Sequence, residues 1–238
     1  MSGHVIVWDL ETVPDIAGYA AANGLTGKLD EEIREALGNK FAKHIYHSIV
    51  CIGALVAHKE RDHWAVDALG APHVGERPEK ELIASFVDRI AQLTPQIVTF
   101  NGNTFDVPVL RYRAMIHAVA AQGLTARPYF NRYTEHALDL CDVLSSFAPH
   151  TKASLNELSR IMGLPGKPDS MAGAEVERYF SMARSRKLPT IVKVMSSTPI
   201  AFGYDTSCFG ASYPMSHSKR AKQIWASSSE RGATRNSI

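Results

Sequence analysis

Residues 5–15, VIVWDLETVPD, constrain the fold more than any other part of the chain. The run from Val5 to Trp8 is apolar at every position, which is typical of a strand buried on both faces of a sheet. Side chains at positions i and i+2 of a strand share a face, so Asp9 and Glu11 point the same way. Like charges this close are costly unless a cation lies between them or one carboxyl takes a proton. The segment therefore predicts a cation site at the end of a core strand.

A third acid, Asp106, lies in FNGNTFD, where the apolar strand IVTF gives way to a helix. Taken alone, Asp106 has an equally good structural explanation as the third residue of a helix capped by Asn103. Asp9 and Glu11 have one too, as a strand end that dips into solvent, but their apolar neighbours favour a central strand. Acids at the carboxyl ends of buried strands lie where open α/β sheets place their sites. The three acids are therefore candidates for one site.

The hydrophobic periodicity predicts an α/β fold, with a mixed sheet that carries helices on both faces. Two strands joined by a short polar turn, 47–59 and 62–69, form a hairpin. Helices are predicted over 31–37, 77–93 and 153–164, and a further helix from 173. Residues 96–122 are predicted to form a strand, a turn and a helix, and 136–147 a strand end that leads into a helix.

Composition is typical of a soluble globular protein, with 238 residues of which 45% are hydrophobic. No run approaches the roughly 20 apolar residues of a membrane span. The chain enters its first strand without the basic and apolar regions of a signal peptide. Its three cysteines, Cys51, Cys141 and Cys208, have neither metal-site spacing nor a disulfide framework. We therefore expect a cytoplasmic protein without a membrane partner.

The charge divides the chain in two. Residues 1–181 hold 17 basic and 22 acidic side chains, a net charge of −5, whereas residues 182–238 hold 9 and 2, a net charge of +7. The second segment is rich in Ser and has neither helical nor strand periodicity. We interpret residues 1–181 as one domain and residues 182–238 as a basic, poorly ordered tail.

The motifs around the acids resemble a known family. DLET followed by FNGNTFDVPVL resembles the first two motifs of the DEDD superfamily of 3′–5′ exonucleases, which have a ribonuclease-H-like fold. YHSIVCIGALV, LGAPHVGERPEKELIASFVDRI, ARPYFNRYTEHALDLCDVLSSF and KASLNELSRIMGLPGKPD are similar to a bacterial group related to the proofreading exonuclease domain of family-B DNA polymerases. The similarity runs almost continuously from residue 4 to about residue 180.

This resemblance implies a two-metal mechanism at the 3′ ends of nucleic acid, with single-stranded DNA as the expected partner. Asp9, Glu11 and Asp106 would be the catalytic residues and would hold two Mg²⁺ or Mn²⁺ ions, which favour carboxylate and phosphate oxygens. Asn101 and Phe105 fall in the second motif. We expect turn bonding and packing from them, with substrate binding as a second possibility.

Further polar residues have two interpretations each. Asp139 and Asp142 match a segment typical of the family, but a helix N-terminus explains them as well. Arg111 and Arg113 would meet phosphate or lie on a solvated helix face. His47 lies in a loop with a second histidine, where solvated side chains are commoner than ligands.

The third motif of the family is absent, because neither Tyr-x-x-x-Asp nor His-x-x-x-x-Asp occurs after residue 180. A shifted reading frame explains this absence together with the change of charge. Codons shifted by one base from Met182 allow DGEIAEVADYCESDVVNTY, which places the motif's tyrosine at Ile191 and its aspartate at Met195. The fixed Met and Trp codons at 182, 195 and 225 are compatible with this frame. We interpret the tail as frame-shifted and expect an impaired enzyme.

Two other functions stay open on the sequence. A non-catalytic nucleic-acid-binding protein would use the basic tail to bind phosphates. A ribonuclease-H-like nuclease of a different kind would cut a branched or hybrid substrate internally rather than at its 3′ end.

Overall fold

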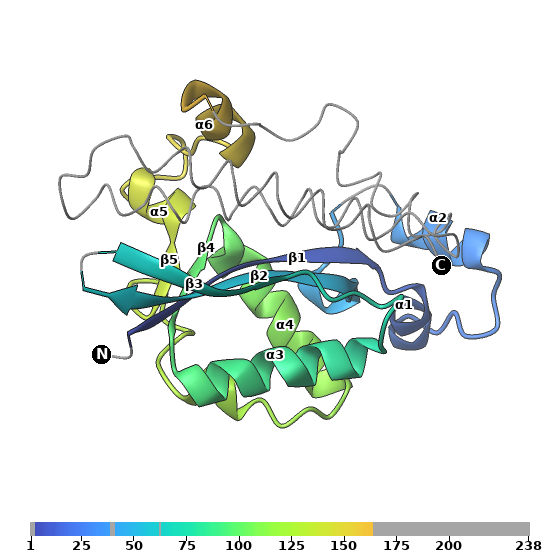
Figure 1. Cartoon of the computed structure of the whole chain (residues 1–238). Helices are drawn as coiled ribbons and strands as arrows, with labels where there is room; N and C mark the ends of the chain where they lie inside the picture. Colours follow the sequence, from blue (N-terminus) through green and yellow to red (C-terminus); the bar gives the residue numbers. More distant parts are fainter. Residues whose placement is uncertain (1–2, 39–40, 62, 164–238) are drawn as a thin grey trace, which may run out of the picture.

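A computed structural model of the chain describes residues 3–38, 41–61 and 63–163. Five strands form one sheet in the order β3-β2-β1-β4-β5 (Figure 1). Antiparallel pairing joins β3 to β2 and β2 to β1, whereas β1, β4 and β5 are parallel. The predicted mixed sheet and the predicted hairpin are therefore confirmed. The strands are β1 (His4–Pro14), β2 (His47–Glu60), β3 (His63–Gly70), β4 (Gln96–Thr99) and β5 (Ala137–Asp139).

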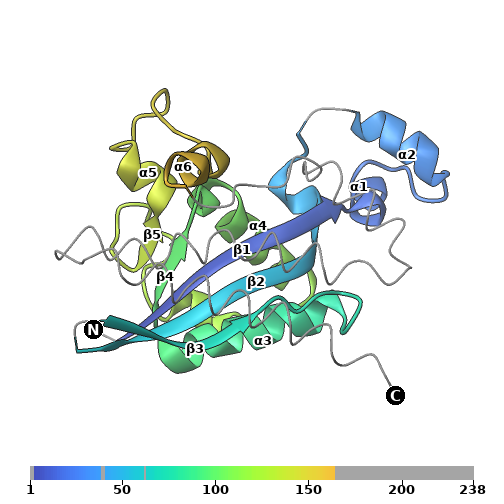
Figure 2. The same cartoon turned by 45° about the horizontal axis from the view of Figure 1, so that its top comes forward.

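Helices cover both faces of the sheet, as the sequence predicts. In Figures 1 and 2, α3 and α4 lie on one face, α5 and α6 lie on the other, and α1 and α2 lie beyond the end of β1. The helices are α1 (Ile16–Ala22), α2 (Asp30–Leu37), α3 (Glu79–Leu93), α4 (Asp106–Ile116), α5 (Leu140–Leu144) and α6 (Leu155–Ile161), with short 3-10 turns η1 (His44–Tyr46), η2 (Gly102–Thr104) and η3 (Gln122–Thr125). Only α1 lacks a sequence prediction among the helices, and Asp15 caps it by accepting the Gly18 N–H at 2.9 Å.

Strand β1 lies at the centre of the sheet and is buried on both faces. Trp8, which is 1% exposed, lies in the larger core with residues of α3 and α4, and its ring centroid is 4.9 Å from that of Phe86. Val5 and Val7 pack on the opposite face with Leu140 of α5. Asp9 and Glu11 alternate with Trp8 along the strand and so share the face of Val7. Their position follows from the register of the core.

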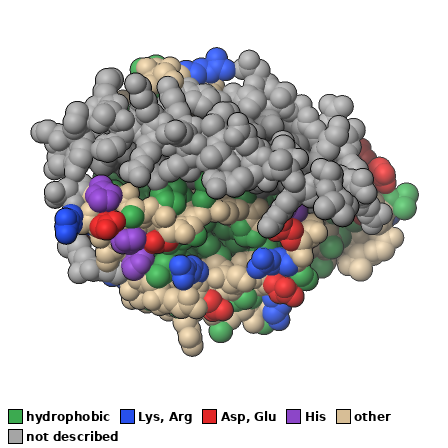
Figure 3. All heavy atoms as spheres, viewed as in Figure 1, with side chains coloured by type: hydrophobic (Ala, Val, Ile, Leu, Met, Phe, Trp, Pro, Cys, Tyr) green, Lys and Arg blue, Asp and Glu red, His purple; other side chains and the backbone are tan. Residues whose placement is uncertain are grey.

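Residues 164–238 lie outside the described residues, and with them the predicted helix from 173 and the tail. No helix in the described part of the chain is long and apolar enough to cross a membrane. Among the described residues on the side shown in Figure 3, basic and acidic side chains are interspersed. The described residues on that side therefore form no broad field of one sign.

A buried ion-pair cluster ties α4 to the rest of the fold. Arg113 of α4 is 4% exposed and donates to both carboxylate oxygens of Glu79, at 2.7 and 2.6 Å, and to Asp15. Glu79, the first residue of α3, also accepts the Ile49 N–H of β2 at 2.7 Å and lies 2.8 Å from His117 Nε2. Burial lowers the pKa of Arg113, but the bonds to Glu79 and Asp15 outweigh it and raise that pKa. Both sequence interpretations of Arg113, phosphate contact and solvated face, are wrong.

Replacing Arg113 by Met should lower the free energy of unfolding by about 3 to 5 kcal/mol, because Glu79 and Asp15 would keep buried charges without their partner. Urea denaturation at pH 7 measures this. The control is Arg89→Met, at an exposed position of α3, which should change stability by less than about 0.5 kcal/mol. Equal stability of the two variants would contradict a structural role for the cluster.

Candidate functional site

The acids Asp9 and Glu11 lie inside β1 rather than at its end. The strand pairs with β2 as far as Pro14, with a bulge after Glu11, so the prediction that the strand ends at these acids is wrong. Pairing of β1 with the parallel strand β4 stops at Val7 and Val98. The two acids therefore follow the carboxyl end of the parallel part of the sheet, where α/β proteins place their sites.

Asp106 takes the place that β4 leaves free beside β1. Its Oδ1 accepts the Leu10 N–H at 3.0 Å, and the residue is 5% exposed. Asp106 is the first residue of α4, and the cap residue Phe105 makes no side-chain cap bond. The alternative in which Asn103 caps the helix and Asp106 is its third residue is therefore wrong. The hydrogen bond from Leu10 instead joins the start of α4 to β1 at the position between Asp9 and Glu11.

The three carboxylates act on one another electrostatically. Burial raises the pKa of Asp106 well above its usual range, the charge of Asp9 adds to this, and Glu11 contributes less. The hydrogen bond from Leu10 acts in the opposite direction but does not reverse the shift. Burial and the charges of Glu11 and Asp9 also raise the pKa of Cys51, the residue of β2 that pairs with Glu11. The cluster therefore favours either a proton on Asp106 or a bound cation.

Oxygen donors of this kind suit Mg²⁺ or Mn²⁺. A cation would relieve the repulsion that raises the pKa of Asp106. Within the described ranges, no group of three or more His, Cys, Asp or Glu side chains is close enough together to hold a metal ion. The donor chemistry of Asp9, Glu11 and Asp106 thus fits divalent ions, whereas their spacing in this structure is not that of a closed coordination shell.

Asp139 holds the turn that leads to Asp106. Its two carboxylate oxygens accept the N–H groups of Asn101 at 2.7 Å and Asn103 at 2.9 Å, and one of them also accepts the Cys141 N–H at 3.0 Å as the cap of α5. Asn101 has a φ of +67° and accepts the Thr104 hydroxyl. Turn bonding by Asn101 and the helix N-terminus explanation of Asp139 are both confirmed.

Asp142 is a buried structural acid. It is fully buried and accepts both guanidinium bonds of Arg132, at 2.7 and 2.6 Å, while Lys152 Nζ lies 2.8 Å away. The Arg132 bonds hold the pKa of Asp142 below its usual value, with a smaller contribution from Lys152. Lys152 also donates to Asn101 Oδ1 at 3.4 Å, which connects this ion-pair group to the turn before Asp106.

Phe105 packs in a group of aromatic rings next to Asp106. Its ring centroid lies 5.5 Å from that of Phe41, 5.8 Å from His44 and 5.0 Å from His47. His47 is buried, and its Nδ1 lies 3.1 Å from the Thr12 hydroxyl. The expected packing role of Phe105 is confirmed, and the solvated interpretation of His47 is wrong. Phe41 is 76% exposed, and no pattern in the sequence predicts this exposure.

Replacing Asp142 by Asn should lower the free energy of unfolding at pH 7 by about 2 to 3 kcal/mol. A carboxyl whose pKa is lowered by folding stabilises the protein above its unfolded pKa of about 3.9 and loses this effect as the pH falls through its folded pKa. The difference between the two proteins should therefore shrink below about pH 4, as thermal unfolding between pH 7 and pH 3 measures. Asp88→Asn, at an exposed position, is the matched control. A difference independent of pH would contradict the ion-pair explanation.

A search of curated proteins finds no match. The family B DNA polymerase from the hyperthermophilic archaeon Pyrobaculum calidifontis matches with a TM-score of 0.52 and 16% identity, over 84% of this chain and 24% of that chain. E. coli exonuclease I matches with a TM-score of 0.40 and 13% identity in a zinc-bound complex with single-stranded DNA, over 85% of this chain and 43% of that chain.

This chain thus spans about a quarter of the polymerase and less than half of exonuclease I. The polymerase shares the fold, which confirms the predicted ribonuclease-H-like α/β class. A family model described as a predicted 3′–5′ exonuclease related to the exonuclease domain of PolB matches residues 39–192. That span, more than half of the chain, contains Asn101, Phe105 and Asp106, whereas Asp9 and Glu11 precede it. The chain belongs to this family of predicted 3′–5′ exonucleases related to the exonuclease domain of PolB.

Proposed function

We propose that this protein is a metal-dependent 3′–5′ exonuclease of the Tyr-containing DEDD subtype, acting on single-stranded DNA, and that this chain is impaired by its altered C-terminal segment. The observation that carries the proposal is the position of Asp106, whose carboxylate is bonded to Leu10 between Asp9 and Glu11. Membership of the exonuclease family supports the reaction class. The choice of DNA as substrate rests on the sequence resemblance.

Asp9, Glu11 and Asp106 would hold two Mg²⁺ or Mn²⁺ ions. When bound, such ions lower the pKa of a water and stabilise the departing 3′ oxygen of the phosphodiester. The hydrogen bond from the Leu10 N–H holds the Asp106 carboxylate beside β1 for this role. By resemblance, the Glu11 carboxylate would orient the attacking water. The raised pKa of Cys51 keeps its thiol protonated beside Glu11, so that sulfur does not compete as a thiolate ligand.

The impairment follows from the number of carboxylates. The family's fourth acid comes from the third motif, and the shifted frame would place it at Met195, outside the described residues. Three acids carry less charge than four and leave one side of the site without a ligand, so metal affinity and turnover should both fall. The boundary at residue 181 and the frame shift stay predictions.

The decisive assay uses 5′-labelled single-stranded DNA with Mg²⁺ or Mn²⁺. A chain whose frame is restored from codon 182 should shorten the strand from its 3′ end one nucleotide at a time. This chain should be at least about 100-fold slower. Asp106→Asn in the restored chain, or addition of EDTA, should reduce cleavage to background.

Three other results of this cleavage assay would contradict parts of the proposal. Rapid degradation by this chain that Asp106→Asn abolishes would contradict the impairment. Internal cuts instead of a ladder would indicate an internally cutting nuclease. DNA binding without cleavage in the restored chain, unchanged by Asp106→Asn, would favour a non-catalytic protein that binds phosphates through its nine basic residues after position 181.

A further inference from the structure

His47, the first residue of β2, contacts the neighbours of two of the site acids. Its Nδ1 lies 3.1 Å from the hydroxyl of Thr12, the residue after Glu11 in β1. Its ring centroid lies 5.0 Å from that of Phe105, the residue before Asp106, with the two rings at 90°. His47 is 8% exposed. One buried side chain therefore connects the two segments that carry Glu11 and Asp106.

The hydrogen bonds of His47 fix the state of its ring. Its Nε2 lies 3.2 Å from the Ala42 carbonyl oxygen, which can only accept a hydrogen bond, so Nε2 carries the proton. Nδ1 is then the acceptor for the Thr12 hydroxyl. Burial lowers the pKa of His47, in keeping with a neutral imidazole at pH 7. The ring thus holds Thr12 by a directed hydrogen bond rather than by contact alone.

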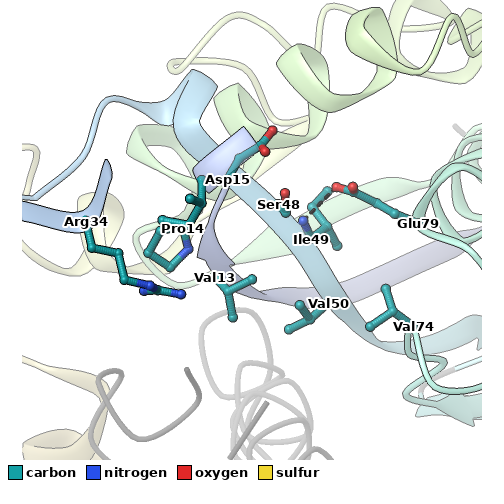
Figure 4. A pocket seen from close by; sticks show the side chains of 10 residues that line it. Val13, Pro14, Asp15, Arg34, Ser48, Ile49, Val50, Val74 and Glu79 are labelled. Atoms are coloured by element: carbon teal, nitrogen blue, oxygen red, sulfur yellow. Dashed lines mark hydrogen bonds between the residues drawn. The ribbon is translucent and has the colours of Figure 1, made fainter. Parts of the chain in front are cut away.

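Strand β1 is irregular just beyond Glu11. Pairing with β2 shifts register between Glu11 and Thr12, which leaves Val50 of β2 as the extra residue of a bulge. Bulges redirect the side chains next to them. A cavity of about 340 Å³ lies at this end of β1, and its lining includes Val13, Val50, Val74 and Arg34 (Figure 4). Because this valine-lined cavity reduces the packing on the strand, the hydrogen bond between Thr12 and His47 is needed to fix it.

The contact with Phe105 affects Asp106 in the same way. Phe105 is the N-cap of α4 and makes no side-chain cap bond, so the packing of its ring fixes the start of the helix. Edge-to-face contacts between aromatic rings are favourable and directional. Strand β2 is anchored beside His47, because the Ile49 N–H donates to Glu79 of α3 at 2.7 Å (dashed in Figure 4). The position of His47 therefore influences the direction in which Asp106 leaves the turn.

We propose that His47 is a positioning residue that sets the spacing between the carboxylates of Glu11 and Asp106. It acts through Thr12 on one side and through Phe105 on the other. Mg²⁺ demands near-octahedral ligand geometry, so a change in this spacing weakens metal binding. This role rests on the proposed function, since the two carboxylates depend on their spacing as metal ligands.

Titration of the full-length chain with Mn²⁺, followed by electron paramagnetic resonance, measures the effect on the site. His47→Leu removes the ring and both hydrogen bonds and should weaken Mn²⁺ binding about tenfold, as for other groups that orient metal ligands from outside the coordination shell. Thr12→Val removes only the hydroxyl and should weaken binding about threefold. The two changes together should be no worse than His47→Leu alone, because both break the same bond.

The amide of Leu10 allows a second measurement that needs no metal. It donates to Asp106, so its hydrogen exchange, followed by nuclear magnetic resonance, reports how firmly Asp106 is held. His47→Leu should speed exchange at Leu10 by at least about tenfold relative to exchange at Ile97. The Ile97 N–H donates to the His136 carbonyl at 2.9 Å in the same sheet, so the ratio removes any effect of lower overall stability.

Tyr129→Phe is the matched control. The Tyr129 hydroxyl donates a buried hydrogen bond to the Pro95 carbonyl at 2.6 Å, at the end of β4 away from the acids. Its loss should lower stability about as much as Thr12→Val does. It should leave both the Mn²⁺ affinity and the ratio of exchange rates at Leu10 and Ile97 unchanged.

Failure of the positioning role and failure of the proposed function give different results. If the unaltered chain and both variants bind Mn²⁺ equally, and exchange at Leu10 is unchanged, the role of His47 is wrong and the metal site stands. If no protein binds Mn²⁺ but His47→Leu speeds exchange at Leu10, the proposed function is overturned while His47 still positions Asp106. Equal losses of Mn²⁺ affinity in Thr12→Val and Tyr129→Phe would make the effect one of general stability, which overturns the positioning role.

Discussion

The bond from the Leu10 N–H to Asp106 is the contact on which the candidate site depends. It joins residues 96 positions apart in the chain and fills the place beside β1 that the shorter strand β4 leaves open. Two other buried groups set its geometry. Asp139 holds the turn before Asp106, and Arg113 fixes α4 two turns further along by binding Glu79 and Asp15. Neither group lies among the three acids, yet both determine where Asp106 lies.

The cost of this arrangement is electrostatic. A buried carboxylate beside two others disfavours its own charged form, which is why the pKa of Asp106 is raised. Val5 and Val7, on the same face of the strand, pack in an apolar cluster and carry no such repulsion. Local conflicts of this kind cluster at functional sites, because the surrounding structure holds them in place. A bound divalent cation would turn the repulsion into an attraction.

Local sequence patterns were sufficient to predict many of the strands and helices. The apolar run of β1, the polar turn between β2 and β3, and the helical spacing of Leu82, Ile83 and Phe86 all depend on neighbours in sequence. The position of the acids on one face also follows from the period of a strand. These features need no knowledge of distant contacts.

The features that sequence missed depend on partners far along the chain. Arg113 has the spacing of a solvated residue, and only its contacts with Glu79 and Asp15 make it a core residue. The capping-box alternative for Asp106 was wrong because the Leu10 N–H lies within reach and has no strand partner there. His47 became buried through Thr12 and the aromatic ring of Phe105. The valine-lined cavity likewise combines three separate segments with Arg34 and was not foreseen.

Titration with Mn²⁺, followed by electron paramagnetic resonance of the free ion, tests most directly whether these acids form a metal site. The full-length chain should bind Mn²⁺, and Asp106→Asn should weaken that binding by at least about tenfold, since each carboxylate ligand adds charge to the site. Asp88→Asn, at an exposed position of α3, should bind Mn²⁺ as the unaltered chain does. Equal Mn²⁺ affinity in the unaltered chain and Asp106→Asn would contradict a metal site at Asp9, Glu11 and Asp106.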